Sequence, residues 1–95
     1  MQVWEEKISN EIVLIHEDSH GYRGFFHKDG DLYMGSSVDL YNEGSIGECM
    51  IFKINPEDHE VDWSELYCER IESTRPEDLI NLLTSSIKEF LDEDS

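Results

Sequence analysis

The stretch "TRPEDLINLLTSSIKEFLDEDS", residues 74–95, carries the clearest structural signal in the sequence. Pro76 suits the first turn of a helix, and Thr74 with Glu77 three residues later has the spacing of a capping box. We therefore predict a C-terminal helix with Thr74 as its N-cap. An apolar stripe at helical spacing indicates that this helix packs on a sheet. The stripe consists of Leu79, Leu82, Leu83, Ile87, Phe90 and Leu91.

The stretch "YRGFFHKDGDLYMGSS", residues 22–37, predicts the first part of that sheet. Two aromatic-rich runs flank Asp29-Gly30, a dipeptide that favours the positive φ angles of a tight hairpin turn. A turn centred there places Phe26 opposite Tyr33. A slip of one residue would exchange the two faces of the hairpin, so the sequence leaves open which face is buried.

The remaining segments predict further strands. Residues 11–17, "EIVLIHE", are apolar at both alternations, which predicts an interior strand covered above and below. Residues 48–54, "ECMIFKI", predict a strand that Asn55-Pro56 ends, because proline lacks the donor that the ladder needs. Residues 64–71 predict a half-exposed strand, 38–47 a loop with room for a turn of helix, and 1–10 a short strand or an irregular lead-in.

These elements together predict an α+β fold. We expect an antiparallel sheet of about four to six strands with one C-terminal amphipathic helix packed across it, and residues 1–95 as a single acidic domain. Leu, Ile, Val and Phe make up about a quarter of the chain, which is above the level at which highly charged sequences stay disordered.

The balance of charge is the strongest global feature. Twenty-three acidic and seven basic residues give a formal net charge of −16. Nucleic-acid phosphates and anionic membrane surfaces both attract Lys and Arg, so this balance argues against direct binding to either. A chain this acidic attracts cationic partners instead, and we expect a basic protein.

Compartment and thiol state follow from the sequence only as expectations. The first residues are acidic where a secretory signal needs basic ones, and no apolar stretch approaches ~20 residues, so we expect a cytoplasmic protein with reduced thiols. Cys49 and Cys68 form no metal-binding motif, and whether they pair with each other stays open.

No catalytic, cofactor or metal signature stands out. His16, Glu17, Asp18 and His20 lie close in sequence, but a strand running into a turn does not give two histidines the helical spacing that converges on zinc. Cys49 opens an apolar strand, where a cysteine usually serves as a small buried apolar residue. We therefore predict no catalytic residue, no metal and no cofactor.

The stretch "NPEDHEVDWSELYCERIE", residues 55–72, holds seven carboxylates and one arginine together with aromatic side chains. Carboxylates steer a basic partner, and aromatic residues supply buried area, so the stretch has both parts of a protein interface. The alternative is a charged edge that only meets solvent. The predicted partner-binding residues are Glu57, Asp58, Glu60, Asp62, Trp63, Glu65, Tyr67 and Glu69.

The leading hypothesis from these observations is a small non-enzymatic inhibitor of a basic protein. Two versions fit: an immunity protein, or antitoxin, against a cationic nuclease toxin, and a phage-type inhibitor that mimics nucleic acid. An accessory or adaptor subunit that docks through an apolar patch is a second class of function. A small metal-dependent hydrolase is the third.

Overall fold

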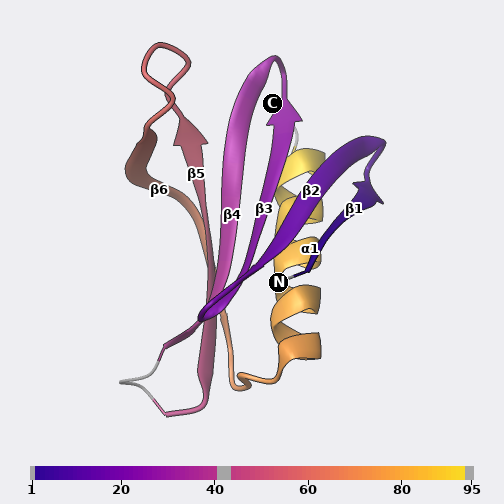
Figure 1. The fold of residues 1–95 in the computed structure, drawn as a ribbon, viewed down its shortest axis with the longest axis vertical. Helices are drawn as coiled ribbons and strands as arrows, with labels where there is room; N and C mark the ends of the chain where they lie inside the picture. Colours follow the sequence, from indigo (N-terminus) through magenta and orange to yellow (C-terminus); the bar gives the residue numbers. More distant parts are fainter. Residues whose placement is uncertain (1, 41–43, 94–95) are drawn as a thin grey trace.

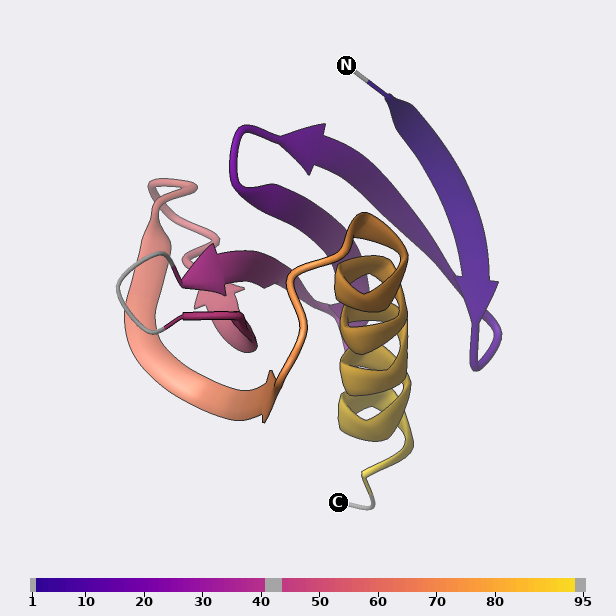
Figure 2. The same cartoon turned by 90° about the horizontal axis from the view of Figure 1, so that it is seen from below.

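The computed structural model describes residues 2–40 and 44–93 of the chain. Within them, six antiparallel strands form one sheet in sequence order, and a helix packs against one face of it (Figures 1 and 2). The elements are β1 (Val3–Ile8), β2 (Glu11–Asp18), β3 (Gly21–Lys28), β4 (Asp31–Leu40), β5 (Ile46–Ile54), β6 (Val61–Ile71) and α1 (Pro76–Asp92). The predicted α+β architecture is confirmed.

The predicted hairpin around Asp29-Gly30 is also confirmed. These two residues have φ angles of 53° and 86°, and β3 pairs with β4 so that Phe26 lies opposite Tyr33. The positive φ angles give the tight turn whose twist matches that of the flanking strands. The structure also decides the face that the sequence left open, since Tyr22 and Phe26 belong to the core shared with the helix.

The prediction that β2 is covered on both faces is wrong. Val13 and Ile15 are fully buried on the helix side, whereas Ile12 and Leu14 are 57% and 43% exposed. Side chains alternate between the faces of a strand, and among the described residues only one face of the sheet carries a helix layer. The apolar residues at both alternations of β2 therefore leave one set facing outward.

Residues 38–47 do not form the predicted loop throughout. Strand β4 continues to Leu40 and β5 begins at Ile46, and these two residues are paired. Backbone pairing with a neighbouring strand holds residues of low strand preference in extended form. Residues 41–43 lie outside the described residues. The predicted strand at 48–54 and its end before Asn55-Pro56 are confirmed, and the first ten residues contain strand β1. The strand predicted at 64–71 is also confirmed, but it is more exposed than expected, since only Tyr67 and Ile71 among these residues are partly buried.

The helix begins one residue later than the predicted cap implies. Arg75, not Thr74, is the N-cap residue, and it makes no side-chain capping bond. Pro76 is the first helical residue, where its missing N–H costs nothing, and this position fixes the cap one residue before it. Side chains outside the helix hold its first turn instead, because Ser73 Oγ and Arg75 Nε donate hydrogen bonds to Asp78.

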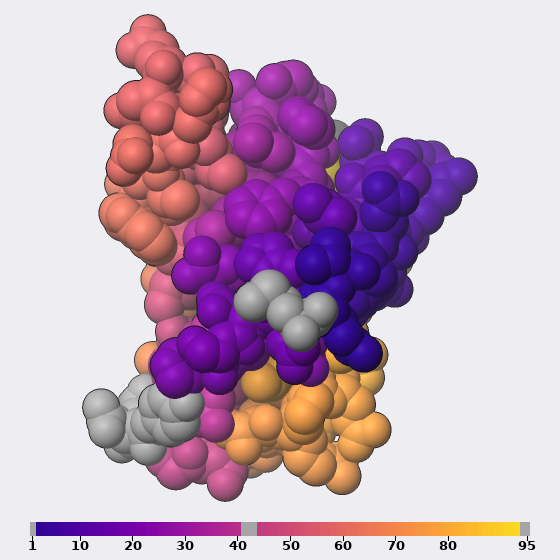
Figure 3. Space-filling view, viewed as in Figure 1, coloured from indigo at the N-terminus to yellow at the C-terminus, as the bar shows by residue number. Residues whose placement is uncertain are grey.

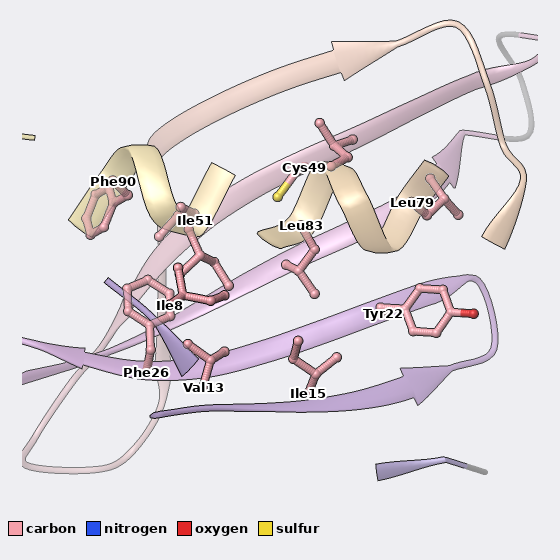
Figure 4. Packing of buried hydrophobic residues seen from close by; sticks show 12 residues of the cluster. Ile8, Val13, Ile15, Tyr22, Phe26, Cys49, Ile51, Leu79, Leu83 and Phe90 are labelled. Carbon is pink, nitrogen blue, oxygen red and sulfur yellow. The ribbon is translucent and has the colours of Figure 1, made fainter. Parts of the chain in front are cut away.

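The main core lies between the sheet and the predicted apolar stripe of α1 (Figure 4). Leu83 and Ile87 are fully buried at its centre. A glycine pair, Gly24 and Gly35 on neighbouring strands, lies directly beneath them. A Cβ at Gly24 would lie 3.0 Å from Ile87 Cδ1, and one at Gly35 would lie 3.0 Å from Leu83 Cδ1. The paired glycines thus allow the helix to approach the sheet closely.

No helix in the described part of the chain combines the length and the apolar character needed to cross a membrane.

Candidate protein-binding site on strand β6

The loop between β5 and β6 presents three of the predicted residues on a well-ordered turn. The Asn55 N–H donates to the Glu60 carbonyl, and the His59 N–H donates to the Asn55 carbonyl, each at 2.8 Å. The Asn55 and Asp58 side chains accept the N–H groups of Glu57 and Glu60, at 2.9 and 3.0 Å. Side-chain bonds of this kind stabilise a turn. The exposed loop extends beyond the neighbouring strands (Figure 3).

Strand β6 is the last strand of the sheet and pairs with β5 on one side. An irregularity interrupts this pairing, because Tyr67 lies opposite Ile51 whereas Asp62 lies opposite Lys53. Several residues of β6 therefore lie opposite Phe52 alone, as in a β-bulge. Bulges bend a strand and re-aim its side chains. The two halves of β6 therefore follow different alternations.

On the helix side of β6, Tyr67 packs against the main core and is only partly exposed. Partial burial raises the pKa of the Tyr67 hydroxyl. Glu69 lies opposite Cys49 and lines a groove between β6 and α1, together with Glu72 and Asp78. The carboxylates of this groove lie mainly on its β6 side, because Asp78 on α1 is already paired with Arg75.

On the other side of β6, Trp63 is 69% exposed, and its ring contacts Phe52 edge to face. Phe52 itself belongs to a small second cluster with Met34 and Ile54, on the sheet face that α1 does not cover. Trp63 is therefore neither a core residue nor a free one. One side of its ring rests on Phe52 and the other side faces solvent. Aromatic residues are enriched at protein interfaces.

The carboxylates of β6 and its loop have few compensating charges. We call the six of them the acidic arm: Glu57, Asp58, Glu60, Asp62, Glu65 and Glu69. Within residues 2–40 and 44–93, none of the six forms an ion pair with a lysine or arginine. Hydrogen bonds from Ser64, and to a smaller extent the charge of Lys53, lower the pKa of Asp62.

A partly buried ion pair beside the arm was not predicted from the sequence. Glu48 is 4% exposed and accepts a hydrogen bond from Arg70 Nε at 2.7 Å. Cys68 Sγ lies 3.6 Å from the same carboxylate. Partial burial, followed by the negative charge of Glu48, raises the pKa of the Cys68 thiol. In the sequence, the only sign of a buried carboxylate here is that Glu48 shares its alternation with the apolar residues Met50 and Phe52.

The structure places the eight predicted partner-binding residues around one exposed strand, not on one flat face. Glu57, Asp58 and Glu60 lie in the loop, and the other five lie on β6. Tyr67 and Glu69 project toward the helix side and Trp63 toward the opposite side. Because β6 ends the sheet, a partner that straddles its edge can contact both sides at once.

The histidines and acids near residue 18 do not converge. His16 stacks on Phe25, with ring centroids 5.6 Å apart, and Asp18 lies 2.9 Å from Arg23 Nε. In the described part of the chain, no three His, Cys, Asp or Glu side chains are placed to hold a metal ion together.

Comparison of the chain with protein-family models, with curated proteins and with solved structures finds no match.

Proposed function

We propose that this protein is a non-enzymatic inhibitor that binds a basic protein through the acidic arm, with Trp63 and Tyr67 on the two sides of β6. One observation carries the proposal: six carboxylates that form no ion pair with a lysine or arginine of the described residues lie on a terminal strand and the loop before it, and the strand also holds a largely exposed tryptophan. Uncompensated carboxylates attract arginine and lysine at long range, and an exposed aromatic ring supplies contact area.

The inhibition is competitive in physical terms. Carboxylates accept charge-assisted hydrogen bonds from arginine and lysine, and these are the side chains that a nuclease uses to hold phosphates. When the acidic arm occupies such side chains, the nucleic acid is displaced. The hydrogen bonds of the 55–60 loop support this mechanism, because they hold the Asp58 carboxylate and the backbone that carries Glu57 and Glu60, and an ordered loop loses little freedom on binding.

Among basic partners we favour a cationic nuclease toxin, for which this chain would act as the immunity protein. The carboxylates sit on a compact, well-packed domain and not along an extended ladder of the kind that imitates a nucleic-acid backbone. The nucleic-acid mimic remains the second version of the same binding mode.

The thiols are poorly suited to nucleophilic chemistry. Burial raises the pKa of Cys49 to about 12, and the pKa of Cys68 is also raised. A thiolate, not a thiol, is the nucleophile, so both groups are held in the unreactive form near neutral pH.

The test removes charge at two places in equal amount. The arm variant carries Glu57→Gln, Asp58→Asn and Glu60→Gln. The matched control carries Glu77→Gln, Glu89→Gln and Glu93→Gln on and beside α1, so both variants lose three negative charges. The parent is used to capture proteins from the source lysate, and each captured protein is purified and titrated against all three chains.

We expect a captured protein of high isoelectric point whose association with the arm variant is slowed at least about tenfold, whereas the control binds like the parent. Binding should weaken steeply with added salt, and a captured nuclease should lose activity when the parent is added. Equal binding by the arm variant and the parent would show that the acidic arm is not the site. An adaptor that docks by apolar contact would respond little to salt.

A further inference from the structure

The sheet face that α1 does not cover carries a continuous apolar row. The strand register places Leu14, Phe25, Met34 and Phe52 side by side on β2 to β5, and the ring of Trp63 completes the row on β6. At the usual spacing of neighbouring strands the row is about 19 Å long. It crosses most of the sheet at right angles to the strands.

The exposed apolar side chains of the molecule concentrate on this same face. The large ones among the described residues are Val3, Ile12, Leu14, Trp63 and Leu66, which are 43–69% exposed. Val3 pairs with His16, whose ring stacks on Phe25 of the row. Leu66 shares its alternation with Cys68, which lies opposite Met50. They form two groups, one on β1 and β2 and one on β6, because Met34 and Phe52 between them are only 2% and 8% exposed. A monomeric protein rarely exposes so many large apolar side chains on one face.

The charges on this face balance, unlike those of the rest of the chain. Among the residues that the strand register assigns to this face, three are acidic and three are basic. Glu65 lies in the same bulge as Trp63, where the register assigns it to neither face. Two acid–base pairs are already formed within this face, between Asp18 and Arg23 and between Glu48 and Arg70. The third acid and the third base are Glu5 and Lys7, both on β1. The chain as a whole has a net charge of −16.

We infer that this face is where two copies of the chain meet. A strongly basic partner is drawn to the acidic arm, and the neutral part of this face on β1 to β5 offers it no surplus of negative charge. A second copy presents the same neutral, apolar surface. In a two-fold contact the same patch of both copies takes part. A face with equal numbers of acids and bases can therefore pair with itself without surplus charge.

The resulting dimer is a sandwich of two sheets with one helix on each outer side. Packed sheets lie about 10 Å apart with their inner side chains interleaved. This contact would cover Leu14 and Trp63 and would leave the loop at 55–60 at the rim. The inference rests on the uncovered sheet face and not on the carboxylates of the acidic arm. It shares Trp63 with the proposed inhibitor surface, so dimerisation and binding of the basic partner should compete.

Sedimentation velocity of the purified chain, from low micromolar to about 500 μM, tests the inference. The double variant Ile12→Gln, Leu14→Gln alters exposed positions on β2 that are remote from the arm and keeps the net charge. Ser85→Gln, on the exposed side of α1, is the matched control. Circular dichroism and urea unfolding establish that all three chains are folded.

We expect the parent to dimerise, the double variant to dimerise at least about tenfold more weakly, and the control to match the parent. Added salt should strengthen the dimer, because it screens the repulsion between two chains of charge −16. This response is opposite in sign to that of the basic partner. In a Trp4→Phe background, the emission of Trp63 should shift to shorter wavelength as the dimer forms.

A parent that stays monomeric throughout this range, at both low and high salt, would overturn the inference. So would a dimer that persists unchanged in the double variant. Loss of basic-partner binding in the arm variant leaves the dimer measurement unaffected, so the two proposals fail separately.

Discussion

Trp63 lies edge to face on Phe52, with ring centroids 5.2 Å apart and an interplanar angle of 68°. Phe52 is 8% exposed and Trp63 is 69% exposed, so one ring forms the base of the second apolar cluster and the other ring covers it. The pair joins the small core on the uncovered sheet face to the proposed binding strand. Within this contact, Phe52 has a structural role and Trp63 has the proposed interface role.

The first prediction compares truncation of these two rings. Phe52→Ala should lower the free energy of unfolding by about 3–5 kcal/mol, because it leaves a cavity between Met34 and Ile54. Trp63→Ala should cost about 0.5–1.5 kcal/mol, since most of that ring is already in water. Urea unfolding followed by circular dichroism measures both. Equal costs would mean that Trp63 is part of the core.

The second prediction concerns the glycines beneath the helix. Gly35→Ala should cost about 1–3 kcal/mol, because the new methyl group would press against Leu83 in a close-packed core. Gly47→Ala should cost more, because its Cβ would lie 2.7 Å from the Ser73 carbonyl oxygen as well as 2.6 Å from Leu79 Cδ2. Backbone yields less readily than a side-chain end.

The matched control for the glycines is Ser36→Ala, which adds no atoms and lies on the uncovered face of the same strand. Its thermal midpoint should stay close to that of the parent. If Gly35→Ala were equally silent, the contact between helix and sheet would be looser than the structure indicates.

The third prediction is that the two thiols differ in reactivity. The native protein should expose one thiol to a disulfide reagent, Cys68, and two after denaturation, because Cys49 is fully buried. At pH 8 Cys68 should react more slowly than free cysteine, because its pKa is raised. Glu48→Gln should speed this reaction, since it removes a nearby negative charge. An unchanged rate would mean that Glu48 does not influence the thiol.

The fourth prediction is that the free energy of unfolding falls at alkaline pH because of the buried Cys49. Its pKa is raised from 9.0 to about 12 by burial, so the unfolded chain loses the proton first. Stability from this group is complete below pH 9 and declines as the pH rises toward 12. Cys49→Val should flatten that decline in a series of urea midpoints. An equally steep decline in Cys49→Val would assign it to other groups.

The fifth prediction concerns stability at acidic pH. Hydrogen bonds from Ser73 and Arg75 lower the pKa of Asp78 below 3.8. A lowered carboxyl pKa stabilises the fold above the unfolded value, and this contribution disappears as the pH falls through the folded value. Asp78→Asn should therefore weaken the fold at pH 7 and reduce its loss of stability between about pH 5 and pH 2. Parallel curves for parent and variant would contradict this account.

Local patterns predicted much of the secondary structure. The stripe of α1 and the turn at Asp29-Gly30 could be predicted because the residues concerned are close in sequence. The predicted cap at Thr74 is wrong, since Pro76 at the first helical position places the cap at Arg75. Residues 38–40 form part of β4 although they resemble a loop, because their pairing partners lie on β5. A local pattern does not contain that information.

The candidate site divides in the same way. The carboxylates of residues 57–69 and their excess over basic residues are visible in the printed sequence. The position of Tyr67 on the helix side and Trp63 on the other depends on the bulge opposite Phe52. The Glu48–Arg70 pair joins residues 22 positions apart, so spacing gave no sign of it.

The sequence by itself determined the sign of the charge, the amphipathic helix and the hairpin, because composition and short-range periodicity act within a few residues. Only the tertiary structure decided that the sheet has one helix-covered face and one apolar face of balanced charge. Strand order and register join side chains from all six strands, and those contacts exist only once the chain has folded.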